Sequence, residues 1–245
     1  MKLRADQWLV KLGLVEDNAK AQALILAGRV FSGHKRIAKA GDLLAEGTLL
    51  AVRGQEHPWV SRGGLKLAHG LAHFGFSPAG RVCLDLGAST GGFTDVLLTN
   101  GARKVHAVDV GYGQLAWKLR CDDRVKVHEK TNARYLDATM AIEPIGALVC
   151  DVSFIGLSTL LPAPLSLCGP GAWAIALIKP QFEADVAAVG NKGVVRDSTV
   201  HDAVCERVEA WWRGLPGWTV SGVLESPVTG PQGNKEFLIG ASRIV

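Results

Sequence analysis

The sequence predicts an α/β protein in which a small N-terminal domain precedes a doubly wound, mostly parallel sheet. From Ser61 onward, short apolar runs typical of buried strands alternate with helix-forming stretches, as in a parallel sheet whose two faces are covered by helices. Residues 1–60 lack this alternation and hold nine basic and six acidic side chains, a net charge of +3, whereas the other residues contribute only +1 to the formal total of +4. A basic unit attached to a nearly neutral body indicates a nucleic-acid-binding domain joined to a second domain.

Composition and length exclude several classes of protein. The chain has 245 residues, of which 48% are hydrophobic and 20% charged, which is typical of a globular protein and not of a disordered one. The longest apolar run, residues 172–178, is much shorter than the roughly 18 residues that span a bilayer, so we expect no membrane partner. The opening MKLRAD does not resemble a signal peptide, and five cysteines without a Cys-x-x-Cys pair do not indicate a disulfide framework. The seven histidines lack the spacing of a metal site, and we expect a cytoplasmic protein without a metal.

Two short helices and a strand are expected in the first domain. The first helix stops at Gly13, and the second is capped by Asp17 or Asn18 and stops at Gly28. The apolar stretch 48–52 is typical of a strand.

The polar stretch that follows this strand is interpreted as a linker, at about residues 53–60. It separates a first domain at residues 1–60 from a second at residues 61–245. Strands of the second domain are expected at residues 82–86, 104–110, 125–128, 147–151, 173–179, 219–224 and 236–239. Helices are expected at residues 93–100, 114–120 and 199–212. Such sheets bind ligands beyond the carboxyl ends of their strands, so the residues that follow each strand are candidates for a functional site.

A glycine-rich turn directly follows the first of these strands. Its candidate ligand-binding residues are Asp85, Gly87, Ala88, Ser89, Thr90, Gly91 and Gly92. Glycines allow a tight turn and the close approach of a ligand, and the helix that follows presents free N–H groups. An acidic residue ahead of the glycines suits a ligand with a cationic amino group better than a pyrophosphate, and S-adenosylmethionine (SAM) is such a ligand. Another adenosine compound in the same kind of turn is the alternative.

Four further residues are candidate contacts of the same ligand. Asp109 ends the second strand, 22 residues after Gly87, where a carboxylate can hold both ribose hydroxyls, and Val110 follows it. Asn132 follows the third strand and can bond the adenine edge or, equally well, cap a helix. Phe154 can pack on the adenosyl group or belong to the core.

Four charged residues stand at the ends of elements that are expected to open into one crevice. Asp151 and Lys179 end two strands, Lys66 precedes the first strand of the second domain, and Glu236 begins the last apolar run. Each alone can be a solvated charge, but their joint placement favours a functional site. A lysine takes up a proton only when its amine is neutral, and burial and a nearby cation both favour the neutral form.

The order Lys66, Asp151, Lys179, Glu236 resembles the K-D-K-E tetrad of FtsJ-type ribose 2′-O-methyltransferases. The resemblance implies a Rossmann-like fold, SAM as cofactor, and methyl transfer to a ribose 2′-hydroxyl, a weak nucleophile that needs a base. It implies that Lys179 takes or steers the proton. Asp151 would orient this lysine and favour the approach of the sulfonium, and Glu236 would hold Lys66 and the target ribose.

The N-terminal unit resembles the αL RNA-binding domain in three segments, RADQWL at residues 4–9, AGRV at 27–30 and GTLLAV at 47–52. This domain followed by an FtsJ-type body, with Ser-Arg-Gly-Gly before the first lysine of the tetrad, is similar to the TlyA family of ribosomal RNA methyltransferases over essentially the whole chain. The family implies cytidine in ribosomal RNA as the target. Whether one or both ribosomal subunits are modified, and the oligomeric state, stay open. An RNA-binding ribosome-assembly protein without turnover, and a haemolysin as some members are called, are the alternatives.

RNA contacts are expected from basic side chains of the first domain and of the segment that follows the linker. These residues are Arg4, Lys11, Arg29, Lys35, Arg36, Lys39 and Arg62. Lysine and arginine bind phosphates without regard to base sequence, although a merely solvated face would look the same. We also hypothesise that linker residues, Trp59 among them, couple RNA capture to SAM binding.

Overall fold

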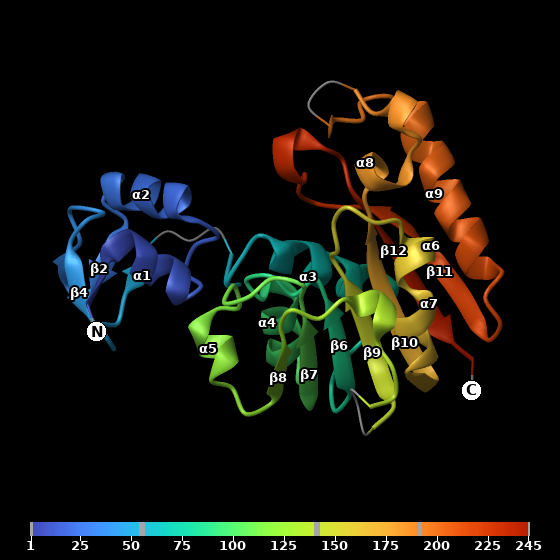
Figure 1. Ribbon diagram of the computed structural model, residues 1–245, viewed down its shortest axis with the longest axis horizontal. Coiled ribbons are helices and arrows are strands. Elements are labelled where there is room, and N and C mark those ends of the chain that lie inside the picture. The colour runs from blue at the N-terminus through green and yellow to red at the C-terminus, as the bar shows by residue number, and fades with distance from the viewer. Residues whose placement is uncertain (1, 54–56, 140–142, 191–192, 245) are drawn as a thin grey trace.

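The computed structural model describes residues 2–53, 57–139, 143–190 and 193–244. Residues 54–56 of the expected linker lie outside this described part. The chain forms a small N-terminal lobe and a larger body built on a seven-stranded sheet. Figure 1 shows the lobe at one end of the molecule, beside helix α5 (Trp117–Arg120).

The central sheet has the strand order β11-β12-β10-β9-β6-β7-β8. Its strands are β6 (Val82–Leu86), β7 (Lys104–Val108), β8 (Val125–His128), β9 (Ile145–Cys150), β10 (Cys168–Ile178), β11 (Trp218–Glu225) and β12 (Phe237–Arg243). Strands β6 to β10 pair in parallel, whereas β12 runs antiparallel to both β10 and β11. The prediction of a mostly parallel, doubly wound sheet is confirmed.

Helices cover both faces of this sheet. Cys83 belongs to the apolar cluster under α3, α4 and α5, and its neighbour Leu84 to the cluster under α6, α7 and α9, as the alternation of side chains along a strand requires. The helices of the body besides α5 are α3 (Gly63–Phe74), α4 (Gly92–Thr99), α6 (Leu157–Leu160), α7 (Pro162–Ser166), α8 (Pro180–Glu183) and α9 (Ser198–Arg213). Short 3₁₀ helices are η1 (Ala133–Tyr135), η2 (Val186–Ala188) and η4 (Pro231–Gly233). Among the described residues, no helix combines the length and the apolar character that crossing a membrane requires.

The N-terminal lobe has a hydrophobic cluster of its own around Leu9, Ile25 and Val30. Its elements are β1 (Lys2–Arg4), α1 (Ala5–Lys11), α2 (Asn18–Leu26), β2 (Val30–Ser32), β3 (Lys35–Arg36), β4 (Leu43–Ala45) and β5 (Ala51–Val52). The cap of α2 is Asp17, whose carboxylate accepts a hydrogen bond from the backbone N–H of Lys20 at 2.7 Å. The strand expected at residues 48–52 is present only as β5. A domain boundary at residue 60 stays a prediction.

The end of α1 packs against the start of α5. Gly13 has a φ of +68°, and a Cβ at this position would overlap the side chain of Ala116. The Lys11 ammonium lies 5.0 Å from the ring centroid of Trp8 and 5.4 Å from that of Trp117. Since Trp8 is in the lobe and Trp117 in the body, this cation connects the two parts of the chain.

Candidate active site

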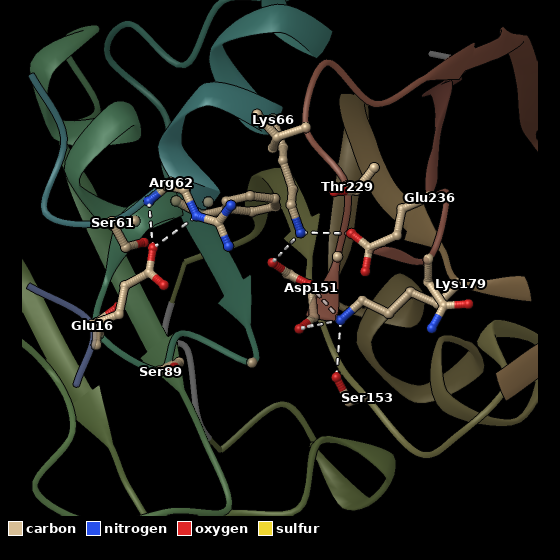
Figure 2. A pocket seen from close by; sticks show the side chains of 18 of the residues that line it. Glu16, Ser61, Arg62, Lys66, Ser89, Asp151, Ser153, Lys179, Thr229 and Glu236 are labelled. Atoms are coloured by element: carbon tan, nitrogen blue, oxygen red, sulfur yellow. Dashed lines mark hydrogen bonds and ion pairs between the residues drawn. The ribbon is translucent and has the colours of Figure 1, made fainter. Parts of the chain in front are cut away.

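The carboxyl ends of the parallel strands open into a cavity of about 620 Å³. Its walls come from the start of α3, the turns that follow β6, β9 and β10, and the segment before β12, while Glu16 lines it from the N-terminal lobe. Figure 2 shows Lys66, Asp151, Lys179 and Glu236 pointing toward one another at one side of this cavity. The fold therefore brings together the four charged residues that the sequence singled out.

Asp151 lies between the two lysines. Its Oδ1 is 2.6 Å from Lys179 Nζ, and its Oδ2 is 3.8 Å from Lys66 Nζ. Lys66 Nζ is in turn 2.6 Å from Glu236 Oε2. The four side chains form one chain of ion pairs, Glu236–Lys66–Asp151–Lys179, built from residues up to 170 positions apart in sequence.

Three members of this chain are almost cut off from water. Lys66 is 8%, Lys179 7% and Glu236 1% exposed. Burial alone lowers the pKa of Lys66, but the nearby carboxylates of Asp151 and Glu236 outweigh burial and raise it above the ordinary value. Lys66 is therefore held as an ammonium.

The Lys179 ammonium has two further acceptors. It donates a hydrogen bond to Ser153 Oγ at 3.0 Å and a longer one to the backbone carbonyl of Asp151 at 3.4 Å. With Asp151 Oδ1, these make three acceptors for the three N–H groups of the ammonium.

The glycine-rich turn after β6 is packed so closely against the rest of the body that its glycines have no room for a side chain. Gly87 has a φ of +77°, and a Cβ there would lie 2.8 Å from the carbonyl oxygen of Asp151. A Cβ at Gly92 would overlap Ser61 Oγ. Gly87, Ala88, Ser89, Thr90 and Gly92 line the large cavity. Gly91 does not, because it faces Leu115 and Leu119.

Asp109 is fixed by backbone hydrogen bonds at the end of β7. Its Oδ2 accepts from the N–H of Ser89 at 2.8 Å and its Oδ1 from the N–H of Gly111 at 2.7 Å. Each carboxylate oxygen keeps a second lone pair, so the group can still accept two hydroxyls. Asp109 lines a smaller cavity of about 10 Å³ next to Ser89.

Asp85 lies beneath the turn and not on the surface of either cavity. It is 0% exposed, and its Oδ2 accepts a hydrogen bond from Thr94 Oγ1 at 2.6 Å. Burial raises the pKa of Asp85 to about 7. The sequence predicted a direct contact between Asp85 and a ligand, and the buried position of Asp85 does not favour such a contact.

Three other candidate ligand contacts have different surroundings. Asn132 caps η1, where its side chain accepts from the N–H of Arg134 at 3.1 Å, and it lines neither cavity. Val110 is exposed and also outside both cavities. Phe154 is 88% exposed, so it is not a core residue, and it stands at the large cavity with its ring 4.8 Å from that of Phe182.

The basic residues expected to contact RNA fall into two groups. Arg29, Lys35, Arg36 and Lys39 are exposed on the N-terminal lobe, with the middle two forming strand β3. These four side chains are accessible to a large polyanion.

The other three basic residues, Arg4, Lys11 and Arg62, have acidic or aromatic neighbours. Arg4 pairs with the buried Asp6 at 2.7 Å, and Lys11 lies between the two indole rings described above. Arg62 is at the cavity, where its backbone N–H and its Nε both donate to Glu16 Oε1, at 3.2 and 3.4 Å. In Figure 2 the guanidinium of Arg62 lies between Glu16 and Lys66.

Two residues of the expected linker, Trp59 and Val60, contact the body. Trp59 packs on Gly64 at the start of α3, where a Cβ would overlap its ring. The N–H of Val60 donates to Asp95 Oδ2 at 2.9 Å, and Asp95 is in the first turn of α4, directly after the glycine-rich turn. Coupling between the linker and SAM binding itself stays a prediction.

Comparison with known proteins identifies the family of this chain. The model of FtsJ-like methyltransferases matches residues 59–243. The chain is 43% identical to the 16S/23S rRNA (cytidine-2′-O)-methyltransferase TlyA of Mycobacterium tuberculosis, over 97% of this chain and 89% of that protein. The chain is an FtsJ-like methyltransferase of the TlyA family. It is also 38% identical to Hemolysin A of Brachyspira hyodysenteriae, over 96% of this chain and 98% of that protein. A solved structure from Streptococcus thermophilus, described as a hemolysin, has a TM-score of 0.76 and 42% identity, and covers 99% of this chain and 89% of that one.

SAM is the methyl donor of FtsJ-like methyltransferases, and the residues of this TlyA-family chain fit it. SAM supplies a methyl group on a positively charged sulfur. Gly87, Ala88, Ser89, Thr90 and Gly92 of this turn line the cavity, so their backbone forms a cradle that a ligand can approach closely. Asp151 supplies a partly exposed carboxylate beside that cradle, which suits a cationic ligand.

Sequence reasoning missed several residues at the site of this methyltransferase. Ser153 contacts Lys179, Glu16 contacts Arg62, and Thr229 lines the cavity. A serine or threonine after a strand carries no signal of its own. Glu16 is 46 positions from Arg62, and no pattern in the sequence indicated that the N-terminal lobe reaches the cavity.

Proposed function

We propose that this chain transfers the methyl group of SAM to a ribose 2′-hydroxyl of ribosomal RNA, with cytidine as the target nucleotide. The observation that carries the proposal is the buried chain of ion pairs at the SAM cradle, in which Lys179 and Lys66 share Asp151. Two lysines at a partly exposed carboxylate are costly for stability alone. A role in removing a proton from a hydroxyl accounts for the presence of both lysines.

Lys179 is the group that takes the proton of the 2′-hydroxyl. Lys179 lines the cavity, and to take up the proton it must act as an amine with one free lone pair. Asp151 keeps the amine in place through the 2.6 Å contact. Lys66 stays charged and keeps a positive charge beside Asp151.

The charge of the cluster changes in a way that suits the reaction. With both lysines protonated, the two cations balance Asp151 and Glu236. With Lys179 neutral, the cluster carries a net charge of −1, which attracts a cationic methyl donor. The reaction removes that positive charge from sulfur while Lys179 gains a proton, so the cluster returns to neutrality and no longer favours a cation.

Alignment supplies the rest of the rate enhancement. Gly87, Ala88, Ser89, Thr90 and Gly92 would hold SAM along the turn, and Asp109 would accept the ribose hydroxyls of the adenosine. Oxygen, methyl carbon and sulfur then need to lie on one line, and holding them so is worth several kcal/mol in related intramolecular reactions, on the order of 7–11.

The N-terminal lobe would place the RNA. Four exposed basic residues on the lobe, with Lys35 and Arg36 at their centre, suit phosphate contacts, and Arg62 extends this positive character into the cavity. The lobe packs against α5 through Gly13, so an RNA bound to it has a fixed position relative to Lys179. A structured RNA such as a ribosomal subunit offers two such points of contact at once.

Methyl transfer from labelled SAM to purified small and large ribosomal subunits tests this proposal, with Lys179→Ala as control. Label that makes one RNA linkage resistant to alkali, and that the control loses while it still binds SAM, supports 2′-O-methylation and identifies the subunit. Label that leaves every linkage sensitive to alkali would place the methyl group on a base and contradict the proposal. Binding of RNA and SAM without any transfer would favour the assembly-protein alternative.

A further inference from the structure

A serine completes the surroundings of the proposed base. Ser153 Oγ accepts a hydrogen bond from Lys179 Nζ at 3.0 Å, and among the described residues this is the one hydrogen bond of the Ser153 hydroxyl. We propose that Ser153 is a positioning residue that aims the Lys179 amine at the ribose hydroxyl. This inference rests on the proposed function and adds a residue to its machinery.

The backbone holds Ser153 in place on one side of the cavity. The segment begins at Asp151, whose N–H donates to the carbonyl of Leu86 at 2.9 Å and whose carbonyl packs on Gly87. It ends at Phe154, whose φ of +69° turns the chain sharply. A left-handed conformation at a non-glycine residue costs free energy and persists where the surroundings enforce it, often at functional sites. Figure 2 shows the Ser153 hydroxyl and the Lys179 ammonium pointing at each other.

A lysine side chain needs more than one partner to be aimed. Its ammonium sits on a flexible four-carbon stem, so one ion pair fixes a distance and leaves the direction of the nitrogen open. A neutral amine has two N–H groups and one lone pair. With one N–H on Asp151 Oδ1 at 2.6 Å and the other on Ser153 Oγ at 3.0 Å, the direction of the lone pair is set.

In this proposal, the hydrogen bond that Lys179 loses together with its proton is the one to the backbone carbonyl of Asp151. The carbonyl of Asp151 is 3.4 Å from Nζ, the longest of the three distances and the weakest hydrogen bond. Loss of that proton leaves the two short bonds intact. The amine then keeps its position while its lone pair becomes available to the substrate.

Loss of the hydroxyl should therefore slow turnover without weakening binding. Ser153→Ala is expected to lower kcat for methyl transfer roughly 10- to 100-fold, as small misalignments at a reacting centre do. The dissociation constant for SAM and the KM for RNA should stay within about twofold of the parent values, because Ser153 contributes no charge to either ligand. Ser153→Thr keeps a hydroxyl at the same position and should recover most of the rate.

The experiment is steady-state kinetics on the ribosomal subunit that the full-length enzyme methylates, together with calorimetric titration of SAM. Ser166→Ala is the matched control, because the exposed Ser166 hydroxyl donates to the carbonyl of Ala163 within α7 and does not line the cavity. Should Ser153→Ala fail to bind SAM, Ser153→Cys carries the same expectation, since a thiol is a poor acceptor.

Three results would overturn the inference. They are a kcat of Ser153→Ala equal to that of the parent, a loss confined to KM, and equal losses in the alanine and threonine variants. Each of these leaves the proposed function standing, because the parent enzyme is still active. No transfer by the parent would instead be a failure of the proposed function.

Discussion

Replacing Lys66 with methionine tests whether the buried charge of Glu236 depends on Lys66 for its compensation, as the structure indicates. Glu236 is 1% exposed, its Oε2 has Lys66 Nζ at 2.6 Å, and its Oε1 has no hydrogen-bond partner among the described residues. Lys66→Met keeps most of the volume and leaves that carboxylate alone in the interior. Breaking a buried pair on one side destabilises a protein by about 3–5 kcal/mol. The double variant Lys66→Met with Glu236→Gln removes both charges and should recover most of this loss.

Urea unfolding followed by tryptophan fluorescence measures the free energy of unfolding of the parent, the single variant and the double variant. The deficit of the single variant should be smaller at pH 5 than at pH 7, because the isolated carboxylate takes up a proton on folding and this uptake is easier at low pH. A single variant as stable as the parent at pH 7 would refute the reasoning. So would a double variant no more stable than the single one, since uncompensated charge would then not be the cause.

Three further predictions concern other parts of the chain. Burial raises the pKa of Asp85 to about 7, so the native state binds a proton more tightly than the unfolded state and stability falls as pH rises from 4 to 7. In urea unfolding, Asp85→Asn should match the parent near pH 4 and exceed it at pH 8 by about 4 kcal/mol, since each of roughly three pKa units is worth about 1.4 kcal/mol. Burial lowers the pKa of His106 to about 4, so the unfolded state takes up its proton first and stability falls as pH drops from 6.5 to 4. In His106→Gln, the urea concentration at the midpoint of unfolding should therefore depend less on pH over that range. Gly13→Ala should raise the KM for RNA about tenfold with SAM affinity unchanged, because the added Cβ would overlap Ala116. The control is Gly75→Ala, at the same φ of +68° but in open space, which should leave the KM for RNA unchanged.

Much of the body was predictable because its central strands β6, β7 and β9 are almost wholly buried and mostly apolar. Strands β6 and β8 have the bounds expected from their apolar runs, and β7 differs by two residues at one end. Strand β10 begins five residues earlier than expected, at Cys168, because Gly169 to Gly171 break the apolar run while the backbone continues to pair with β9 after a register shift. The strands of the N-terminal lobe, two or three residues long, are too short to show any periodicity.

Site residues were predictable where a charged residue follows the end of a strand. They were less predictable within a strand, where the direction of the side chain determines whether the residue faces the cavity. Asp151 and Lys179 follow β9 and β10, and their side chains reach the cavity. Asp85 lies one residue before the end of β6, on the same face as Cys83, and that face is covered by α4. Its position next to the glycines suggested a ligand contact, but the alternation along the strand directs it to Thr94.

The two lysines of the cluster differ in what they can do, and the difference comes from their neighbours. Lys66 has Glu236, fully buried, at 2.6 Å and Asp151 at 3.8 Å, and the carboxylates raise its pKa, so releasing its proton would leave a buried carboxylate without a partner. Lys179 pairs with Asp151, whose side chain is 21% exposed and which still has the Lys66 charge nearby when Lys179 is neutral. Removing the Lys179 cation would therefore leave Asp151 with Lys66, whereas removing the Lys66 cation would leave Glu236 without the ion pair that it makes here. In the proposed mechanism this asymmetry divides the work between the two buried lysines: Lys66 supplies a lasting positive charge, and Lys179 handles the proton of the substrate.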